Sequence, residues 1–167
     1  MLICFFQYGF AQPSNDECAG AIPLNLGALN PCPNTTPTVD NFSLTNVNAT
    51  ATSPYPTLTG CNPGNTMDAP AAEVWYTMTA TGNITTFSIT GGLSTPNIAL
   101  FVGNNCGLLQ GVACANAPTG SGSVTLLANT LVGQDYFILI SGGNVTDTGN
   151  FNLSVSSSND CNPCLLG

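Results

Sequence analysis

The sequence predicts an all-β fold, a jelly-roll-like antiparallel β-sandwich of about eight or nine strands that is stapled by disulfide bonds. Three observations predict it. Short runs rich in β-branched and aromatic residues alternate in hydropathy with a period of two, turns of Gly, Asn, Asp and Thr separate them, and no long stretch shows a helical period. At 167 residues the chain has room for one domain with a hydrophobic core.

The clearest strand signal lies in residues 73–80, where apolar residues alternate with threonines and with the single Trp of the chain. A Gly-Asn pair follows at residues 82–83, and a second alternating run covers residues 84–90. Two such runs around a short turn are typical of a β-hairpin, so we expect 73–80 and 84–90 to pair with each other.

Further strands are expected on both sides of this unit. Residues 19–26 contain a Pro and therefore predict an edge strand, and residues 29–70 predict long loops with one strand around 42–45. Downstream, similar runs predict strands at 96–102, 123–127, 136–140 and 151–155. The run 136–140 is apolar on both faces, which favours an interior strand.

The chain contains no Lys, Arg or His, and its eight acidic residues give a formal charge of −8. Binding a nucleic-acid backbone or an anionic membrane surface requires Lys or Arg, so neither is expected as a partner. Without His there is no Ser–His or Cys–His nucleophile and no His-ligated zinc, and without Lys there is no Schiff base. A pair of carboxylates acting on a glycoside remains, but the acids are scattered, so we expect a non-catalytic protein.

Eight cysteines indicate a disulfide framework in an oxidising compartment. Cys106 and Cys114 bracket a short loop, and we expect a disulfide bond between them. The loops of residues 29–70 are expected to be tied by Cys32 and Cys61. No segment reaches the ~20 apolar residues of a membrane-spanning helix. A secreted, extracellular or cell-surface protein without membrane insertion is therefore predicted.

The two ends of the chain predict separate segments. Residues 1–12 are an apolar run that favours a signal-peptide remnant, and the alternative is a strand donated to a neighbouring molecule. Residues 13–157 are expected to form the sandwich, and residues 158–167 a linker or the start of a further module. The sequence of residues 14–18, Ser-Asn-Asp-Glu-Cys, returns in part as Ser-Asn-Asp-Cys at 158–161, which is consistent with a further copy.

Several motifs occur in a fixed order along the chain. They are Asn-Asp-x-Cys-Ala with Ala-Ile-Pro-Leu (15–24), Glu-Val-Trp-Tyr-Thr-Met-Thr-Ala-Thr-Gly (73–82), Ile-Ala-Leu-Phe-Val-Gly-Asn-Asn-Cys-Gly-Leu-Leu (98–109), Val-Ala-Cys (112–114), Leu-Val-Gly-Gln-Asp-Tyr-Phe-Ile-Leu-Ile (131–140) and Gly-Asn-Phe-Asn-Leu-Ser-Val (149–155). Together they resemble the bacterial pre-peptidase C-terminal domain of secreted and cell-surface proteins. The resemblance covers residues 15–157 and implies a jelly-roll-like sandwich that is usually a non-catalytic appendage.

Related domains bind calcium at the Asn-Asp entry. The resemblance therefore implies a calcium site at Asn15, Asp16, Asp68 and Glu73. Clustered carboxylates without Lys or Arg are relieved by a bound cation or by protonation, and Ca²⁺ takes oxygen ligands. The alternative is that Asn15 and Asp16 form a turn or cap.

Two functions remain open. The first is a structural or adhesive module of an extracellular assembly such as a surface fibre, with copies of itself or other surface-protein modules as partners. The second is an accessory module that holds a secreted enzyme against a polysaccharide or protein. Here Trp75 and Tyr55 are candidates for stacking on a ligand, although Trp75 also suits a core position. Candidate glycosylation sites in Asn-x-Ser/Thr sequons are Asn34, Asn41, Asn48, Asn83, Asn144 and Asn152.

Overall fold

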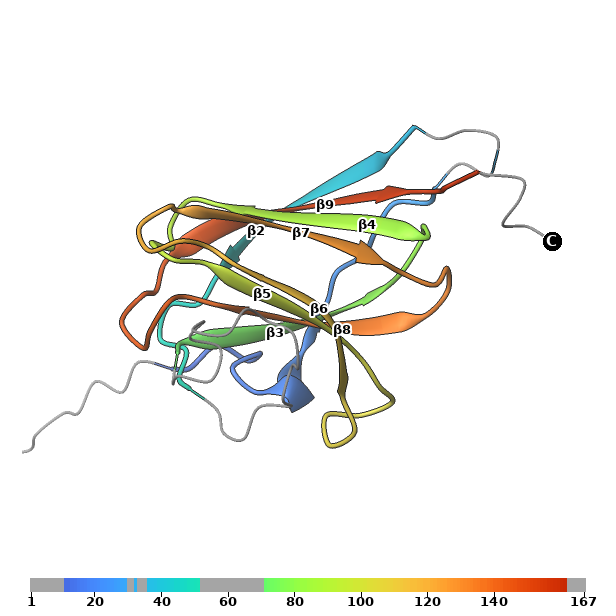
Figure 1. Cartoon of the computed structure of the whole chain (residues 1–167). Coiled ribbons are helices and arrows are strands. Elements are labelled where there is room, and N and C mark those ends of the chain that lie inside the picture. Colours follow the sequence, from blue (N-terminus) through green and yellow to red (C-terminus); the bar gives the residue numbers. More distant parts are fainter. Residues whose placement is uncertain (1–10, 30–31, 33–35, 52–70, 162–167) are drawn as a thin grey trace, which may run out of the picture.

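The computed structural model describes residues 11–29, 32, 36–51 and 71–161. Two β-sheets pack face to face, so the predicted β-sandwich is confirmed (Figure 1). No helix in the described residues is long and apolar enough to cross a membrane. A short 3-10 helix, η1 (Cys18–Gly20), precedes nine strands: β1 (Ile22–Pro23), β2 (Thr38–Thr45), β3 (Glu73–Thr79), β4 (Ile84–Thr90), β5 (Asn97–Val102), β6 (Gln110–Asn116), β7 (Ser123–Asn129), β8 (Asp135–Ser141) and β9 (Asn150–Ser158).

Sheet A has the strand order β1-β3-β8-β5-β6, and sheet B has the order β2-β9-β4-β7. Neighbouring strands are antiparallel except for β1, which runs parallel to β3. The interior position predicted for residues 136–140 is confirmed, because β8 lies between β3 and β5. The predicted edge strand within 19–26 is confirmed for the two residues of β1 alone.

The predicted hairpin between residues 73–80 and 84–90 is wrong. β3 pairs with β8 in sheet A, whereas β4 pairs with β7 and β9 in sheet B. The segment between β3 and β4 therefore crosses from one sheet to the other. A neighbouring segment holds it there, because Thr130 Oγ1 donates a hydrogen bond to the Gly82 carbonyl at 2.8 Å. An added Cβ at Gly82 would lie 2.5 Å from the Ser158 carbonyl oxygen, so a side chain does not fit this close approach to β9.

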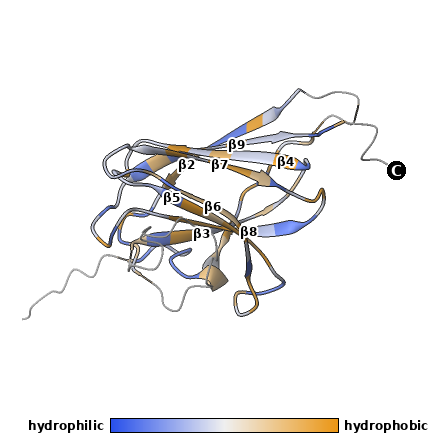
Figure 2. Ribbon diagram, viewed as in Figure 1, coloured by the Kyte–Doolittle hydropathy of each residue, from blue (hydrophilic) through white to orange (hydrophobic). Residues whose placement is uncertain are grey.

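The main core fills the space between the two sheets. Alternate residues of β3, β4, β5, β7, β8 and β9 point into it, as the sequence alternation predicts. Its largest fully buried side chains include Phe87, Phe151, Leu100, Ile138 and Leu153. Each such burial contributes about 1.5–3 kcal/mol, so this core is the main source of stability. The end of strand β9 is pale in Figure 2 because it is a run of serines, and the outward Asn150 and Asn152 of the same strand are exposed.

The predicted Cys106–Cys114 disulfide is wrong, because Cys106 is bonded to Cys18, 88 residues away, with 5.8 Å between the two Cα atoms. The β5–β6 loop that carries Cys106 turns toward the N-terminal segment, whereas Cys114 lies in β6 opposite Ala99. Cys114 also forms a disulfide bond. Loop length alone therefore gave the wrong pairing.

The expected tie between Cys32 and Cys61 is wrong as well, and Cys61 lies outside the described residues. Cys32 is bonded to Cys161, 129 residues later in the chain, with a Cα–Cα distance of 5.6 Å. The bond follows from the pairing of β2 with β9, which brings the approach to β2 beside the end of β9. This disulfide therefore extends a strand pairing that the sequence analysis did not predict.

Candidate functional site

The outer face of sheet A divides into two halves. Cross-strand register places its outward side chains in rows that run across β3, β8 and β5. One row is apolar and the next is mixed, while the last is polar. Beside a buried polar row of Glu73, Ser141 and Asn97 at one end of the face, these rows are Trp75, Leu139 and Ala99, then Thr77, Phe137 and Phe101, then Thr79 and Asp135.

The first half is covered and forms a second, smaller core. Trp75 is only 3% exposed, and its ring centroid lies 5.7 Å from that of Phe101. Cys18 and Leu109 pack over them, and the Cys18–Cys106 disulfide holds the two covering segments together. The prediction that Trp75 stacks on a ligand is corrected, because its buried ring offers no open face. Tyr55, the other stacking candidate, lies outside the described residues.

Asn15 fixes the covering segment to the edge of β3. Its backbone carbonyl accepts a hydrogen bond from the Trp75 N–H at 2.8 Å, and its side-chain amide donates to the Trp75 carbonyl at 3.0 Å. One residue thus satisfies both backbone groups of a strand edge, as a neighbouring strand would. Burial raises the pKa of the Tyr76 hydroxyl, and a hydrogen bond with the Asn15 side chain opposes that rise.

Asp16 and Glu73 meet at Thr50. Asp16 accepts hydrogen bonds from the Thr50 N–H and hydroxyl, both at 2.6 Å, while the Thr50 carbonyl accepts the Glu73 N–H at 3.3 Å. Glu73 is fully buried, and its Oε1 accepts a hydrogen bond from the indole N–H of Trp75 at 3.4 Å. These contacts join three chain segments at the covered end of β3.

Three of the four predicted calcium ligands, Asn15, Asp16 and Glu73, are therefore brought into one buried region. Asp68, the fourth, lies outside the described residues. In the part of the chain that the structure describes, no group of three or more His, Cys, Asp or Glu residues is placed to hold a metal ion. The described contacts of these residues join parts of the chain, and calcium binding stays a prediction.

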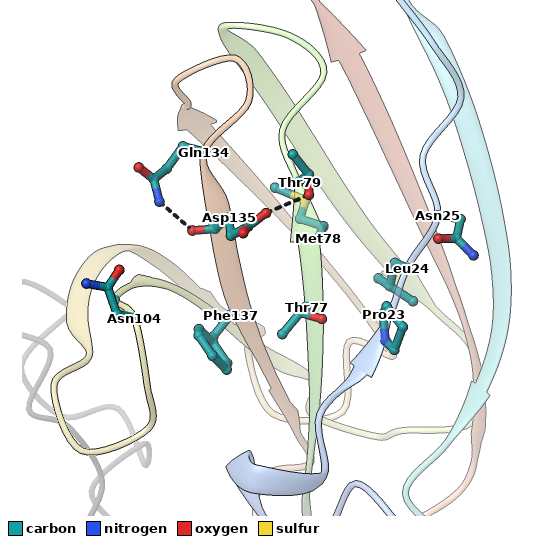
Figure 3. A pocket seen from close by; sticks show the side chains of 11 residues that line it. Pro23, Leu24, Asn25, Thr77, Met78, Thr79, Asn104, Gln134, Asp135 and Phe137 are labelled. Carbon is teal, nitrogen blue, oxygen red and sulfur yellow. Dashed lines mark hydrogen bonds between the residues drawn. The ribbon is translucent and has the colours of Figure 1, made fainter.

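The second half of the face is open and forms a groove of about 400 Å³ (Figure 3). Thr77 and Thr79 of β3 and Asp135 and Phe137 of β8 form its floor. Residues 23–25 form one wall, and Gly103 and Asn104 of the β5–β6 loop line the groove together with Met78 and Gln134. The groove is therefore the part of the sheet face that the N-terminal segment leaves uncovered.

Both walls of the groove are held in place. On one side Leu24 is 6% exposed, and its N–H donates to the Thr77 carbonyl at 2.7 Å. On the other side the Cys18–Cys106 disulfide anchors the loop. An added Cβ at Gly103 would lie 2.8 Å from the Leu108 carbonyl oxygen, so the tight path of this wall requires Gly.

The polar groups of the groove include both hydrogen-bond donors and acceptors. Thr79 Oγ1 donates to Asp135 Oδ1 at 2.6 Å, and the Gln134 amide donates to the Asp135 carbonyl at 3.0 Å. The side chains of Asn25 and Asn104 are exposed and form no hydrogen bond with any described residue. Among the described residues that line the groove, Asp135 alone carries a charged side chain.

The groove continues past Phe137 and Thr77 into a second hollow, which is also lined by Cys18, Asn105 and Gly107. The half-buried Phe137 ring thus lies between two adjoining hollows. Sequence reasoning missed this site. The pairing register of β3 and β8 sets Phe137 opposite Thr77. This register is what identifies Phe137 as an outward aromatic residue beside small polar ones.

Asp147 lies away from the groove and joins two turns. Its carboxylate accepts hydrogen bonds from the backbone N–H groups of Ser94, Thr95 and Gly143 at 2.8–2.9 Å. Burial raises the pKa of this carboxyl, but the hydrogen bonds together outweigh burial and lower it. Asp40 is likewise structural, because its Oδ2 accepts the Gly27 N–H at 2.9 Å.

The sequons occupy varied positions. Asn41 and Asn152 are exposed on the neighbouring strands β2 and β9, and Asn48 and Asn144 are exposed near turns. Asn83 Oδ1 accepts the Asp160 N–H at 2.7 Å. Asn34 lies outside the described residues, and glycosylation stays a prediction at all six positions.

No protein-family model, curated protein or solved structure matches the chain. The resemblance to the pre-peptidase C-terminal domain therefore stays a prediction.

Proposed function

We propose that the chain is a non-catalytic structural and adhesive module of an extracellular assembly. The observation that carries this proposal is the pair of long-range disulfides, Cys18–Cys106 and Cys32–Cys161, which join segments 88 and 129 residues apart. Disulfides of this kind persist in oxidising compartments. Copies of the chain, or other surface-protein modules, are its proposed partners.

The roles of the acidic side chains support a function without catalysis. Asp16, Asp40 and Asp147 accept hydrogen bonds that join separate segments of the chain. Of the acids in the described part of the chain, Asp135 alone lines the groove, whereas glycoside hydrolysis uses a pair of carboxyl groups on either side of the scissile bond. The arrangement suits a rigid module better than a hydrolase.

Concentration-dependent assembly tests the structural role. We expect the disulfide-bonded chain to form larger particles or filaments as its concentration rises, as measured by sedimentation velocity and electron microscopy. A chain that stays monomeric at high concentration, both alone and with other proteins of the same surface, would contradict the proposal.

A second candidate function is an accessory binding module that holds a polysaccharide or protein. The open groove on sheet A favours it, because an aromatic ring and several polar side chains, among them the exposed amides of Asn25 and Asn104, line a concave surface. Binding and assembly are compatible, since the groove occupies one face of one sheet.

A further inference from the structure

We infer that the groove on sheet A binds an extended, neutral polysaccharide chain. The inference names the ligand of the second candidate function and rests on the proposal that the chain is non-catalytic. Three features of the groove support it: the aromatic ring, the polar groups around the ring and the length of the concave surface.

The first feature is the position of Phe137. Figure 3 shows Phe137 and Pro23 on either side of Thr77, with Phe137 on the floor of the groove and Pro23 in its wall. Phe137 is half-buried, whereas Trp75 and Phe101 on the same sheet face are 3% and 1% exposed. A partly exposed ring with polar neighbours suits a ligand that is apolar on one face and polar at its edge, as a sugar ring is.

The second feature is the chemistry of the lining. The amides of Asn25, Asn104 and Gln134 provide donors and acceptors, and Asp135 provides acceptors. Sugar hydroxyls donate and accept, so they match this mixed set. A cationic ligand would use only the acceptor oxygens and leave the amide N–H donors unpaired. A polyanion would meet Asp135 and no cation, because the chain has no Lys, Arg or His.

The third feature is the shape of the groove. Two hollows adjoin at Thr77 and Phe137, so the concave surface extends along the sheet on both sides of the ring. An extended chain fits this surface better than a single sugar. The walls are fixed by the Leu24–Thr77 hydrogen bond and the Cys18–Cys106 disulfide, so binding orders few protein groups.

The test is affinity electrophoresis of the full, disulfide-bonded chain in native gels. The gels contain hydroxyethylcellulose, arabinoxylan, dextran or, as the anionic comparison, polygalacturonate. We expect at least one neutral polymer to retard the chain, and Phe137→Ala to weaken that binding about tenfold or more. Leu127→Ala is the matched control, because Leu127 is 65% exposed on β7 of sheet B, and it should bind like the wild type.

Asn104→Ala, in the exposed wall, is a second variant that tests the site even if Phe137→Ala fails to fold; it should also weaken binding. The inference is overturned if no neutral polymer retards the chain. It is also overturned if both groove variants bind like the wild type, or if polygalacturonate binds more strongly than every neutral polymer. A reducing-end assay on the same polymers separates the two proposals, because released sugar ends would contradict the non-catalytic function and leave the binding result intact.

Discussion

The two halves of the outer face of sheet A share one backbone geometry and differ in what covers them. Trp75 and Leu139 are 3% and 2% exposed beneath the N-terminal segment, whereas Phe137, one row further along the same strands, is half-buried in an open groove. Strand alternation sends all three side chains to the same face. Covering segments, and not the strands themselves, decide which half stabilises the fold and which half is open to a ligand.

The boundary between the halves follows the path of the N-terminal segment. Asn15 pairs with Trp75 at the edge of β3, and the parallel strand β1 then pairs beside Tyr76 and Thr77. Beyond Leu24 the chain leaves for sheet B, where the Gly27 N–H donates to Asp40. The segment therefore covers the Trp75 end and leaves the Asp135 end open.

The largest expected effect is that of Trp75→Ala in the covered half. Removing a buried aromatic side chain costs about 3–5 kcal/mol, since the cavity left behind adds to the lost burial. Equilibrium unfolding in urea should show this loss in the free energy of unfolding. A loss below about 1 kcal/mol would show that the covered half is not a core.

Removing the Cys18–Cys106 disulfide with the double substitution Cys18→Ala and Cys106→Ala comes next. We expect a loss of about 2–4 kcal/mol in unfolding free energy, because the bond limits the unfolded chain across a long loop. The matched control removes Cys32 and Cys161. Both variants should be destabilised, but only the first should also weaken groove binding, since only this bond anchors a groove wall.

Asp147 and Asp135 give a smaller contrast that depends on pH. The lowered pKa of Asp147 means that its contribution to stability is present above its unfolded pKa, near 3.8, and is lost as pH falls through the folded value. Asp147→Asn should cost about 1–2 kcal/mol at pH 7 and flatten the acid limb of the stability profile. Asp135→Asn, in the open groove, should change the stability little. Parallel acid limbs for the wild type and Asp147→Asn would contradict this assignment.

The sequence predicted the architecture because alternation directly reports which residues face the core. It placed the interior strand at residues 136–140 and the two-faced pattern of 151–155 correctly. It failed on the hairpin after residue 80 and on the pairing of Cys106, because both depend on segments distant in the chain, Thr130 and Cys18. Local spacing carries no information about such contacts.

The groove escaped prediction for a related reason. Phe137 lies in a run that is apolar on both faces, and the sequence cannot show which of its outward residues lies under a covering segment. The same limit applies to Trp75, because its burial depends on Asn15 and Cys18. Asn15 lies 60 residues before Trp75 in the chain. Whether a segment packs over the outer face of a sheet is decided by tertiary contacts between residues that are distant in the chain.

The most direct test of the division between the two halves is a urea titration of Phe137→Ala beside the wild type, with and without the neutral polysaccharide that retards the chain most strongly. Without the polymer we expect Phe137→Ala to lose only about 1 kcal/mol, because its ring is half-buried. With the polymer, the unfolding midpoint of the wild type should rise, and that of Phe137→Ala should rise clearly less, because a ligand stabilises the folded state in proportion to how tightly that state binds it. Equal rises in both proteins, or a loss as large as that of Trp75→Ala, would contradict the account.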